Sequence, residues 1–169
     1  PFPRSGTFLT VSQIAQPDDA TQLASIVEAA ARTQTPLLTT AGDSKWDWGR
    51  GLADTVHNDR SLGHSTPTQL NLSALSGIVD YEPSELVLVV GAATPLAQIE
   101  PLLTEQGQHL AFEPVHWRST ATAGGTVAVG LAGPRRFRAG SVRDFVLGLQ
   151  FVDGKGRLVR SGGRVVKNV

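Results

Sequence analysis

The chain has 169 residues, 40% of them hydrophobic, and its 15 basic side chains are balanced by 15 acidic ones. This composition fits a folded protein of one good-sized domain or two very small ones, and the neutral charge argues against nucleic acid or an anionic membrane as a partner. The absence of cysteine excludes disulfides, thiolate metal sites and iron–sulfur clusters within this chain.

The first half of the chain predicts a strand, a helix and a second strand. Residues 8–12 predict a short edge strand, and Asp18-Asp19 predicts an acidic N-cap for the helix. Apolar residues then recur with the spacing of one helical face at Leu23, Ile26, Val27 and Ala30. Residues 36–40 predict a buried strand, which leads into a loop at 41–50.

The middle of the chain predicts short strands and one further helix. Strands are predicted at residues 69–72, 75–81, 85–93 and 109–112. Thr94-Pro95 predicts the N-cap and first residue of the helix, because proline lacks an N–H that this position does not need. Pro101 predicts a kink or a shortened first part, and Gly107 predicts the helix end.

The end of the chain predicts a β-hairpin. Residues 145–152 and 157–160 flank Asp153-Gly154-Lys155-Gly156, a turn sequence of the kind that joins antiparallel strands. Separated helices combined with short strands predict an α+β fold.

The segment 121–130 is the most informative part of the chain. It holds two adjacent glycines, and no large side chain occurs before Leu131. Glycine has no Cβ, so a flat ring or a phosphate can approach the backbone closely, and we expect the amide N–H groups to be free to donate to it. The alternative interpretation is an ordinary glycine-rich turn.

Three glycine-bearing segments adjoin predicted strands. We call them the first loop (41–50), the second segment (114–130) and the third loop (138–145). Together they could converge on an extended ligand that carries a diphosphate, with Ser44 and Lys45 reaching phosphate oxygens. Neither G-x-G-x-x-G after a strand nor G-x-x-x-x-G-K-[ST] is present, which disfavours a Rossmann domain or a P-loop NTPase.

The order of these segments resembles a known family. Gly42-Asp43-Ser44-Lys45, Ala123-Gly124-Gly125, and Gly140 through Gly148 resemble the FAD-binding domain of the vanillyl-alcohol-oxidase/para-cresol-methylhydroxylase (PCMH) type. Within that type the likeness is strongest to the FAD-binding E subunit of bacterial glycolate oxidase, on residues 130–136 and 142–148. The resemblance runs from about residue 10 to the end of the chain.

The resemblance implies which residues contact FAD. The pyrophosphate would be wrapped by Ala41, Gly42, Asp43, Ser44, Lys45 and Trp46. The flavin and ribityl chain would meet Thr122, Gly124, Gly125, Val127 and Ala128. The adenosine would meet Gly140, Ser141 and Asp144.

The resemblance also implies a domain organisation. The family has two α/β subdomains with the cofactor between them, here about 1–73 and 74–169. The family continues beyond a motif like Lys167-Asn168-Val169, so we expect a domain truncated at its C-terminus.

Two positions depart from the family pattern. Asp43 stands where the family has glycine or a small residue, and its carboxylate would repel a phosphate and lower the affinity for FAD. Ala41 replaces the usual glycine. No histidine or cysteine occupies a position of covalent attachment, so FAD is expected to be held non-covalently.

Other side chains leave alternatives open. Trp46 and Trp48 could cover a ring or anchor the loop, and His116 with Trp117 could face a flavin, although packing is favoured. The arginines at 135, 136 and 138 are either solvated surface or a contact for a partner subunit or a phosphate. No residue is assigned as a catalytic base, no metal site is expected, and no apolar run approaches the roughly 18 residues of a membrane span.

The function implied by the resemblance is oxidation of a small 2-hydroxy acid, such as glycolate to glyoxylate. Electrons would pass through the flavin to a partner, with a sister FAD subunit and an iron–sulfur subunit completing a cytoplasmic complex, either free or peripheral at the inner face of the membrane. One alternative is a non-catalytic assembly subunit that has lost flavin, which Asp43 favours. Another is a different flavoenzyme with the same domain, such as a D-lactate dehydrogenase or a reductase of cell-wall synthesis.

Overall fold

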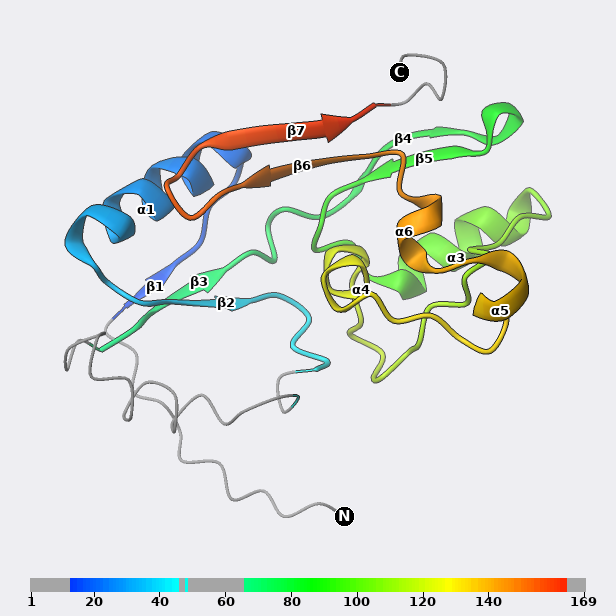
Figure 1. Ribbon diagram of the computed structural model, residues 1–169, viewed down its shortest axis with the longest axis horizontal. Coiled ribbons are helices and arrows are strands. Elements are labelled where there is room, and N and C mark those ends of the chain that lie inside the picture. The colour runs from blue at the N-terminus through cyan, green and yellow to red at the C-terminus, as the bar shows by residue number, and fades with distance from the viewer. Residues whose placement is uncertain (1–12, 46–47, 49–65, 164–169) are drawn as a thin grey trace.

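The computed structural model describes residues 13–45, 48 and 66–163 (Figure 1). The strand predicted at 8–12, the candidate Trp46 and the segment 167–169 lie outside the described residues. The predicted subdomain boundary near residue 73 stays a prediction.

A small parallel sheet opens the fold. Its strands are β1 (Ile14–Ala15), β2 (Leu37–Thr40) and β3 (Thr68–Asn71), in the spatial order β1-β3-β2. Helix α1 (Ala20–Thr33) links the first two strands. The Asp19 carboxylate caps this helix by accepting the N–H groups of Thr21 and Gln22 at 2.8 Å each, which confirms the predicted start.

An antiparallel hairpin and a helix form the buried core. Strands β4 (Ile78–Glu82) and β5 (Val87–Val90) pair through the short 3₁₀ turn η2 (Pro83–Glu85). Helix α3 (Leu96–Glu105) buries one apolar face against this hairpin. The buried cluster consists of Leu96, Ile99, Leu103 and Ala121.

Two local predictions around α3 differ from the structure. Helix α3 begins after Pro95, and the Thr94 hydroxyl does not cap it. This hydroxyl, fully buried, donates to the Gly91 carbonyl at 2.7 Å and accepts the Gly77 N–H at 2.9 Å, so it ties two turns together. The helix continues through Pro101 to its end at Glu105.

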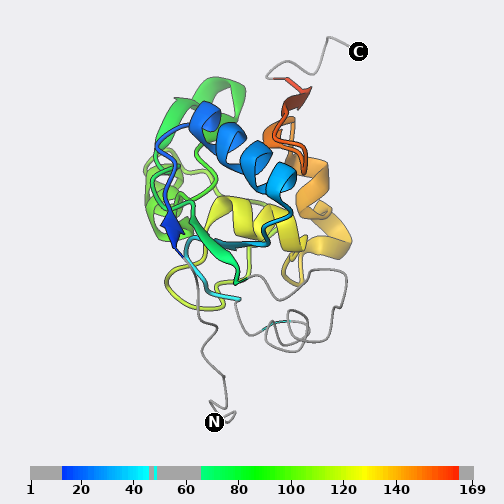
Figure 2. The same ribbon diagram turned by 90° about the vertical axis from the view of Figure 1, so that its left-hand side faces the viewer.

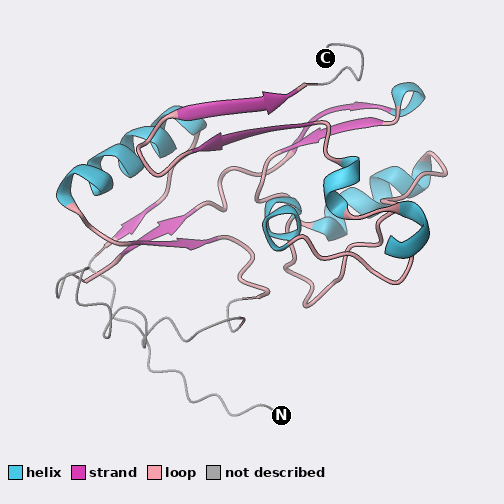
Figure 3. Cartoon of the chain, in the orientation of Figure 1, coloured by secondary structure: helices cyan, strands magenta, loops and turns pink. Residues whose placement is uncertain are grey.

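Three short helices and a second hairpin complete the described chain. They are α4 (Ala123–Val129), α5 (Arg136–Ala139), α6 (Val142–Phe145), β6 (Gly148–Val152) and β7 (Leu158–Gly162). Figure 3 shows the three helices clustered beside α3, with the β6–β7 hairpin running away from them.

The predicted hairpin turn at 153–156 is confirmed, because Asp153 accepts the N–H groups of Lys155 and Arg157 at 2.9 Å. The strand predicted from residue 145 instead starts at Gly148.

The strand predicted at 109–112 is wrong. These residues form irregular chain and a turn. Phe112 is buried and its ring packs against the Phe145 ring, with centroids 5.6 Å apart. The apolar residues that suggested a strand therefore belong to a loop, and this loop packs against α6.

The last hairpin packs on the first helix. Gly156 lies in its turn with φ +78, and a Cβ there would lie 2.6 Å from the Ala24 carbonyl of α1. Only glycine permits both this backbone conformation and this approach. Figure 2 shows α1 beside β6 and β7. The predicted α+β class is confirmed, and α1 contacts both strands of the β6–β7 hairpin.

Candidate cofactor-binding site

The first loop follows β2 directly. Asp43 adopts a left-handed conformation with φ 49, which glycine takes without strain and which aspartate tolerates better than most residues. Its carboxylate accepts the N–H of Ala41 at 3.0 Å. Ser44 is buried, and the Lys45 ammonium donates to its hydroxyl at 3.4 Å.

Four consecutive N–H groups of the first loop are unused as hydrogen-bond donors among the described residues. Within the described part of the chain, the N–H groups of Gly42, Asp43, Ser44 and Lys45 have no acceptor. Successive N–H groups around a left-handed residue form a concavity that suits an anion. The Lys45 charge adds to this preference, so the loop has the chemistry of a phosphate site.

The first loop contacts the second segment. A Cβ on Gly42 would lie 1.8 Å from the Thr120 carbonyl oxygen and 2.9 Å from the Thr122 methyl carbon. Such distances are far inside van der Waals contact, so only glycine fits here. The predicted convergence of these two segments is therefore present.

The second segment is a helix start rather than a turn. Thr122 is the N-cap of α4, and its hydroxyl accepts the Gly125 N–H at 3.2 Å. The Ala123 N–H donates to the Thr94 carbonyl at 2.9 Å. The expectation that the amides of this segment are free to bind a ligand is therefore wrong at these residues.

The double glycine allows two stretches of backbone to approach each other. The Gly124 N–H donates to the Ala92 carbonyl at 2.7 Å, and a Cβ on Gly124 would lie 2.8 Å from the same oxygen. The glycine thus joins α4 to the segment after β5. The residues that receive these bonds, Ala92 and Thr94, were not predicted as part of the site. Their signal in the sequence is the run of small residues that follows the β5 strand.

The second segment and the third loop line one pocket of about 410 Å³. Val127 and Gly130 contribute from the α4 side, and Val142 and Arg143 from α6. The pocket is also lined by the chain before β6 and by the ends of the β6–β7 hairpin, through Val146, Leu147, Gly148, Leu149, Ser161 and Gly162. Arg143 and Gly130 were not among the predicted site residues, and Ala128 is exposed on α4.

The third loop is held by its own side chains. The Asp144 carboxylate accepts the Ser141 N–H at 2.7 Å and the Ser141 hydroxyl at 3.0 Å. The backbone bond from Ser141, followed by its hydroxyl, lowers the pKa of Asp144. Gly140 has φ +106, and a Cβ there would meet the same carboxylate at 2.9 Å. Ser141 and Asp144 therefore form the turn that the third loop requires.

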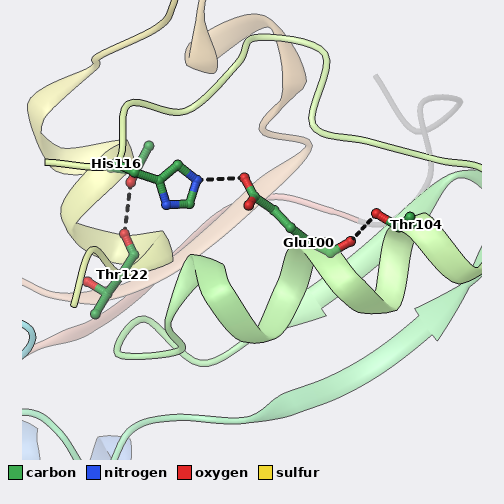
Figure 4. A network of polar contacts seen from close by, with 5 residues as sticks. Glu100, Thr104, His116 and Thr122 are labelled. Carbon is green, nitrogen blue, oxygen red and sulfur yellow. Dashed lines mark hydrogen bonds and ion pairs between the residues drawn. The ribbon is translucent and has the colours of Figure 1, made fainter. Parts of the chain in front are cut away.

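Two side-chain contacts brace the second segment. The Trp48 and Trp117 rings meet edge to face at 5.1 Å, which connects the first loop to the chain before α4. Figure 4 shows the His116 imidazole directed at Glu100 of α3, with 2.7 Å between Nε2 and Oε1. These contacts support the packing interpretation of His116, Trp48 and Trp117.

A protein-family model described as an FAD binding domain matches residues 11–162. The chain belongs to this FAD-binding family. The FAD-binding domain is 43% identical over 143 residues to the glycolate oxidase subunit GlcE of Escherichia coli (strain K12), covering 85% of this chain and 37% of that protein. It is 26% identical over 156 residues to a D-lactate dehydrogenase of Archaeoglobus fulgidus, covering 92% and 32%. The chain thus spans about a third of the length of these curated relatives.

Solved structures show the same fold. Alkyldihydroxyacetonephosphate synthase matches with a TM-score of 0.66 at 15% identity, over 92% of this chain and 27% of that one. A variant of berberine bridge enzyme matches with a TM-score of 0.66 at 18% identity, over 87% and 27%. The predicted PCMH-type fold and family are confirmed.

No helix among the described residues combines the length and hydrophobicity needed to cross a bilayer. These residues contain no group of three or more histidine, cysteine or acidic side chains placed to hold a metal ion.

Proposed function

We propose that this FAD-binding domain belongs to a subunit of a glycolate-oxidase-like flavoprotein that oxidises a small 2-hydroxy acid, with glycolate giving glyoxylate. The observation that carries the proposal is the 43% identity to a glycolate oxidase subunit over most of the chain. The partners would be a sister FAD subunit and an iron–sulfur subunit. The complex would be cytoplasmic, free or peripheral at the inner face of the membrane.

The first loop has the donors that a dinucleotide pyrophosphate needs. The unused N–H groups of Gly42 through Lys45 would bind the phosphate oxygens, with the Lys45 ammonium neutralising their charge. When bound, FAD supplies the hydride acceptor and passes electrons onward. The domain's own residues position the cofactor.

The other predicted contacts would act through shape more than through main-chain donors. The pocket between Val127 and Val142 offers apolar walls and the Arg143 guanidinium to one end of the cofactor. The edge of α4 against which the cofactor would lie is formed by Thr122, Gly124 and Gly125. No cysteine exists in the chain, and we propose that FAD is held non-covalently.

Two alternative functions have specific support. Asp43 places a carboxylate beside the donors of the first loop, which favours an assembly subunit that has lost flavin. The likeness to a D-lactate dehydrogenase favours a different 2-hydroxy acid as substrate.

The test is the visible spectrum and FAD affinity of the purified full-length protein. Flavin absorption bands, or stoichiometric uptake of added FAD, support the proposal, whereas a colourless protein that takes up no FAD supports the assembly subunit. Glycolate and D-lactate are then compared as substrates in an assay with an artificial electron acceptor. If D-lactate bleaches the flavin and glycolate does not, the substrate is D-lactate and the proposal of glycolate is wrong.

A further inference from the structure

Glu113 has a backbone conformation that its side chain does not favour. Its φ is 49, in the left-handed region that glycine adopts without strain. Gln34 and Leu86 share this region, but both are helix C-caps, where it is common. Glu113 instead follows a turn that its own N–H closes, by donating to the Leu110 carbonyl at 3.0 Å. Strained residues of this kind persist where several contacts hold them, and they are frequent at ligand-binding sites.

The contacts that hold Glu113 come from the loop after α4. The Arg135 N–H donates to the Glu113 carboxylate at 3.0 Å, and the Arg135 guanidinium lies 3.7 Å from the same carboxylate. The Gly133 N–H donates to the carbonyl groups of Phe112 and Glu113, at 3.0 and 2.8 Å. A Cβ on Gly133 would lie 2.8 Å from the Glu113 Cβ, so the two chain segments are in direct contact. We call these contacts the Glu113 clamp.

The clamp and the neighbouring Phe112 reach two elements that line the pocket. Gly130 lines the pocket at the end of α4, three residues before Gly133. Phe112 is buried against Phe145, whose helix α6 supplies Val142 to the same pocket. Helices α4 and α6 also contact each other. One turn of the chain therefore holds both the segment that leaves α4 and the helix α6.

We infer that Glu113 is a positioning residue for the cofactor, whose clamp holds the end of α4 at the distance from α6 that the pocket needs. Glu113 does not line the pocket, so it acts through the N–H groups of Gly133 and Arg135. The inference rests on the proposed function, because it takes the pocket to receive one end of FAD. Binding sites depend on such supporting contacts, since their geometry must be held to within about 0.5 Å.

The alternative is that the clamp only stabilises the fold. Three substitutions separate these roles, because the backbone strain and the carboxylate can be removed independently. Glu113→Ala removes the carboxylate and keeps the strained backbone, whereas Glu113→Gly removes both. Glu113→Gln keeps a side-chain oxygen that can accept the Arg135 N–H.

The test measures the melting temperature of the full-length subunit without FAD, and its dissociation constant for FAD. We expect Glu113→Ala to weaken FAD binding by about tenfold, the change expected from one hydrogen bond to a charged group. Glu113→Gln should stay within about threefold of the wild type. Glu113→Gly should melt at a higher temperature than Glu113→Ala, because its backbone is unstrained, and still bind FAD as weakly as Glu113→Ala.

Leu86 provides the matched control. It has a φ of 57 and is 76% exposed at the end of η2. Leu86→Gly should also melt at a higher temperature than Leu86→Ala, while both variants bind FAD within about twofold of the wild type. Hydrogen exchange without FAD gives a second readout. Glu113→Ala, but not Leu86→Ala, should speed the exchange of the Gly130 N–H in the pocket lining.

Three results would overturn the inference. The first is an FAD affinity of Glu113→Ala equal to that of the wild type. The second is an affinity that recovers in Glu113→Gly together with the melting temperature, which would assign Glu113 to stability alone. The third is an unchanged exchange rate of the Gly130 N–H in Glu113→Ala.

The proposed function fails in a different way. A wild-type subunit that takes up no FAD removes the flavin proposal, and the role of Glu113 with it. A wild type that binds FAD, with Glu113 variants that bind it equally well, removes the role of Glu113 alone and leaves the proposed function in place.

Discussion

Replacing Gly42 by alanine tests the contact between the first loop and the second segment. The added Cβ would lie 1.8 Å from the Thr120 carbonyl oxygen, where real contacts essentially never fall under 3.0 Å. Both sides of this clash are backbone, so the first loop and Thr120 must separate by about 1 Å or more. Gly154 provides the matched control, since a Cβ there would meet nothing within 4 Å.

The expected loss follows from this displacement. Overpacking of a rigid site lowers the free energy of unfolding by about 1–3 kcal/mol, and we expect the upper part of this range because no flexible side chain can yield. A loop displaced from its neighbour loses the alignment of its donors, so FAD binding should weaken by about 10- to 100-fold, or about 1.4–2.8 kcal/mol.

The assay combines thermal unfolding with fluorescence titration of FAD for Gly42→Ala and Gly154→Ala. The reasoning is refuted if Gly42→Ala keeps the melting temperature and FAD dissociation constant of the wild type. Equal losses in both variants would point to a general effect of alanine on turns instead.

Three further predictions concern single polar groups. Asp43→Asn keeps a residue that tolerates a positive φ but removes the negative charge of the side chain. FAD should therefore bind roughly three- to tenfold tighter at low salt. The control variant Glu105→Gln on α3 should leave the FAD affinity unchanged in the same titration. Thr94→Val leaves the Gly77 N–H without its acceptor and should lower the free energy of unfolding in urea by about 2 kcal/mol; an unchanged midpoint would contradict this. Arg157 lowers the pKa of Asp153 from 3.8 to about 2, so this carboxylate stabilises the fold above pH 3.8 and loses that effect as the pH falls toward 2. The melting temperatures of wild type and Asp153→Asn should therefore differ at pH 6 and converge near pH 2, and a difference that persists at pH 2 would exclude this cause.

Local chemistry was sufficient to predict the elements whose ends are fixed by neighbouring residues. Asp19 caps α1 through bonds to N–H groups two and three residues later, and Asp153 closes its hairpin in the same way. The pairing of strands that lie far apart in the sequence was not predictable from local chemistry. The order β1-β3-β2 depends on which strands meet after the chain has passed through residues 41–67.

The contact between the first loop and the second segment was predicted, but the free amides expected in the second segment are not present at the start of α4. Adjacent glycines have low helix propensity, so Gly124-Gly125 suggested a turn. In the structure, the Ala92 and Thr94 carbonyls accept N–H groups from the start of α4, and these tertiary bonds outweigh the local preference. In the first loop, by contrast, the left-handed residue and the unused amides arise within five residues, although the sequence analysis did not predict the positive φ of Asp43.

The bonds that join the start of α4 to the chain after β5 bear on how the protein would lose and regain its cofactor. Those amides are satisfied by the polypeptide itself, so removing the flavin leaves no helix end to unravel. Reconstitution should then be one bimolecular step whose rate rises in proportion to the FAD concentration, without a slow phase of chain reorganisation. In such an apoprotein, the edge of α4 that is proposed to contact the cofactor would already be formed before FAD binds.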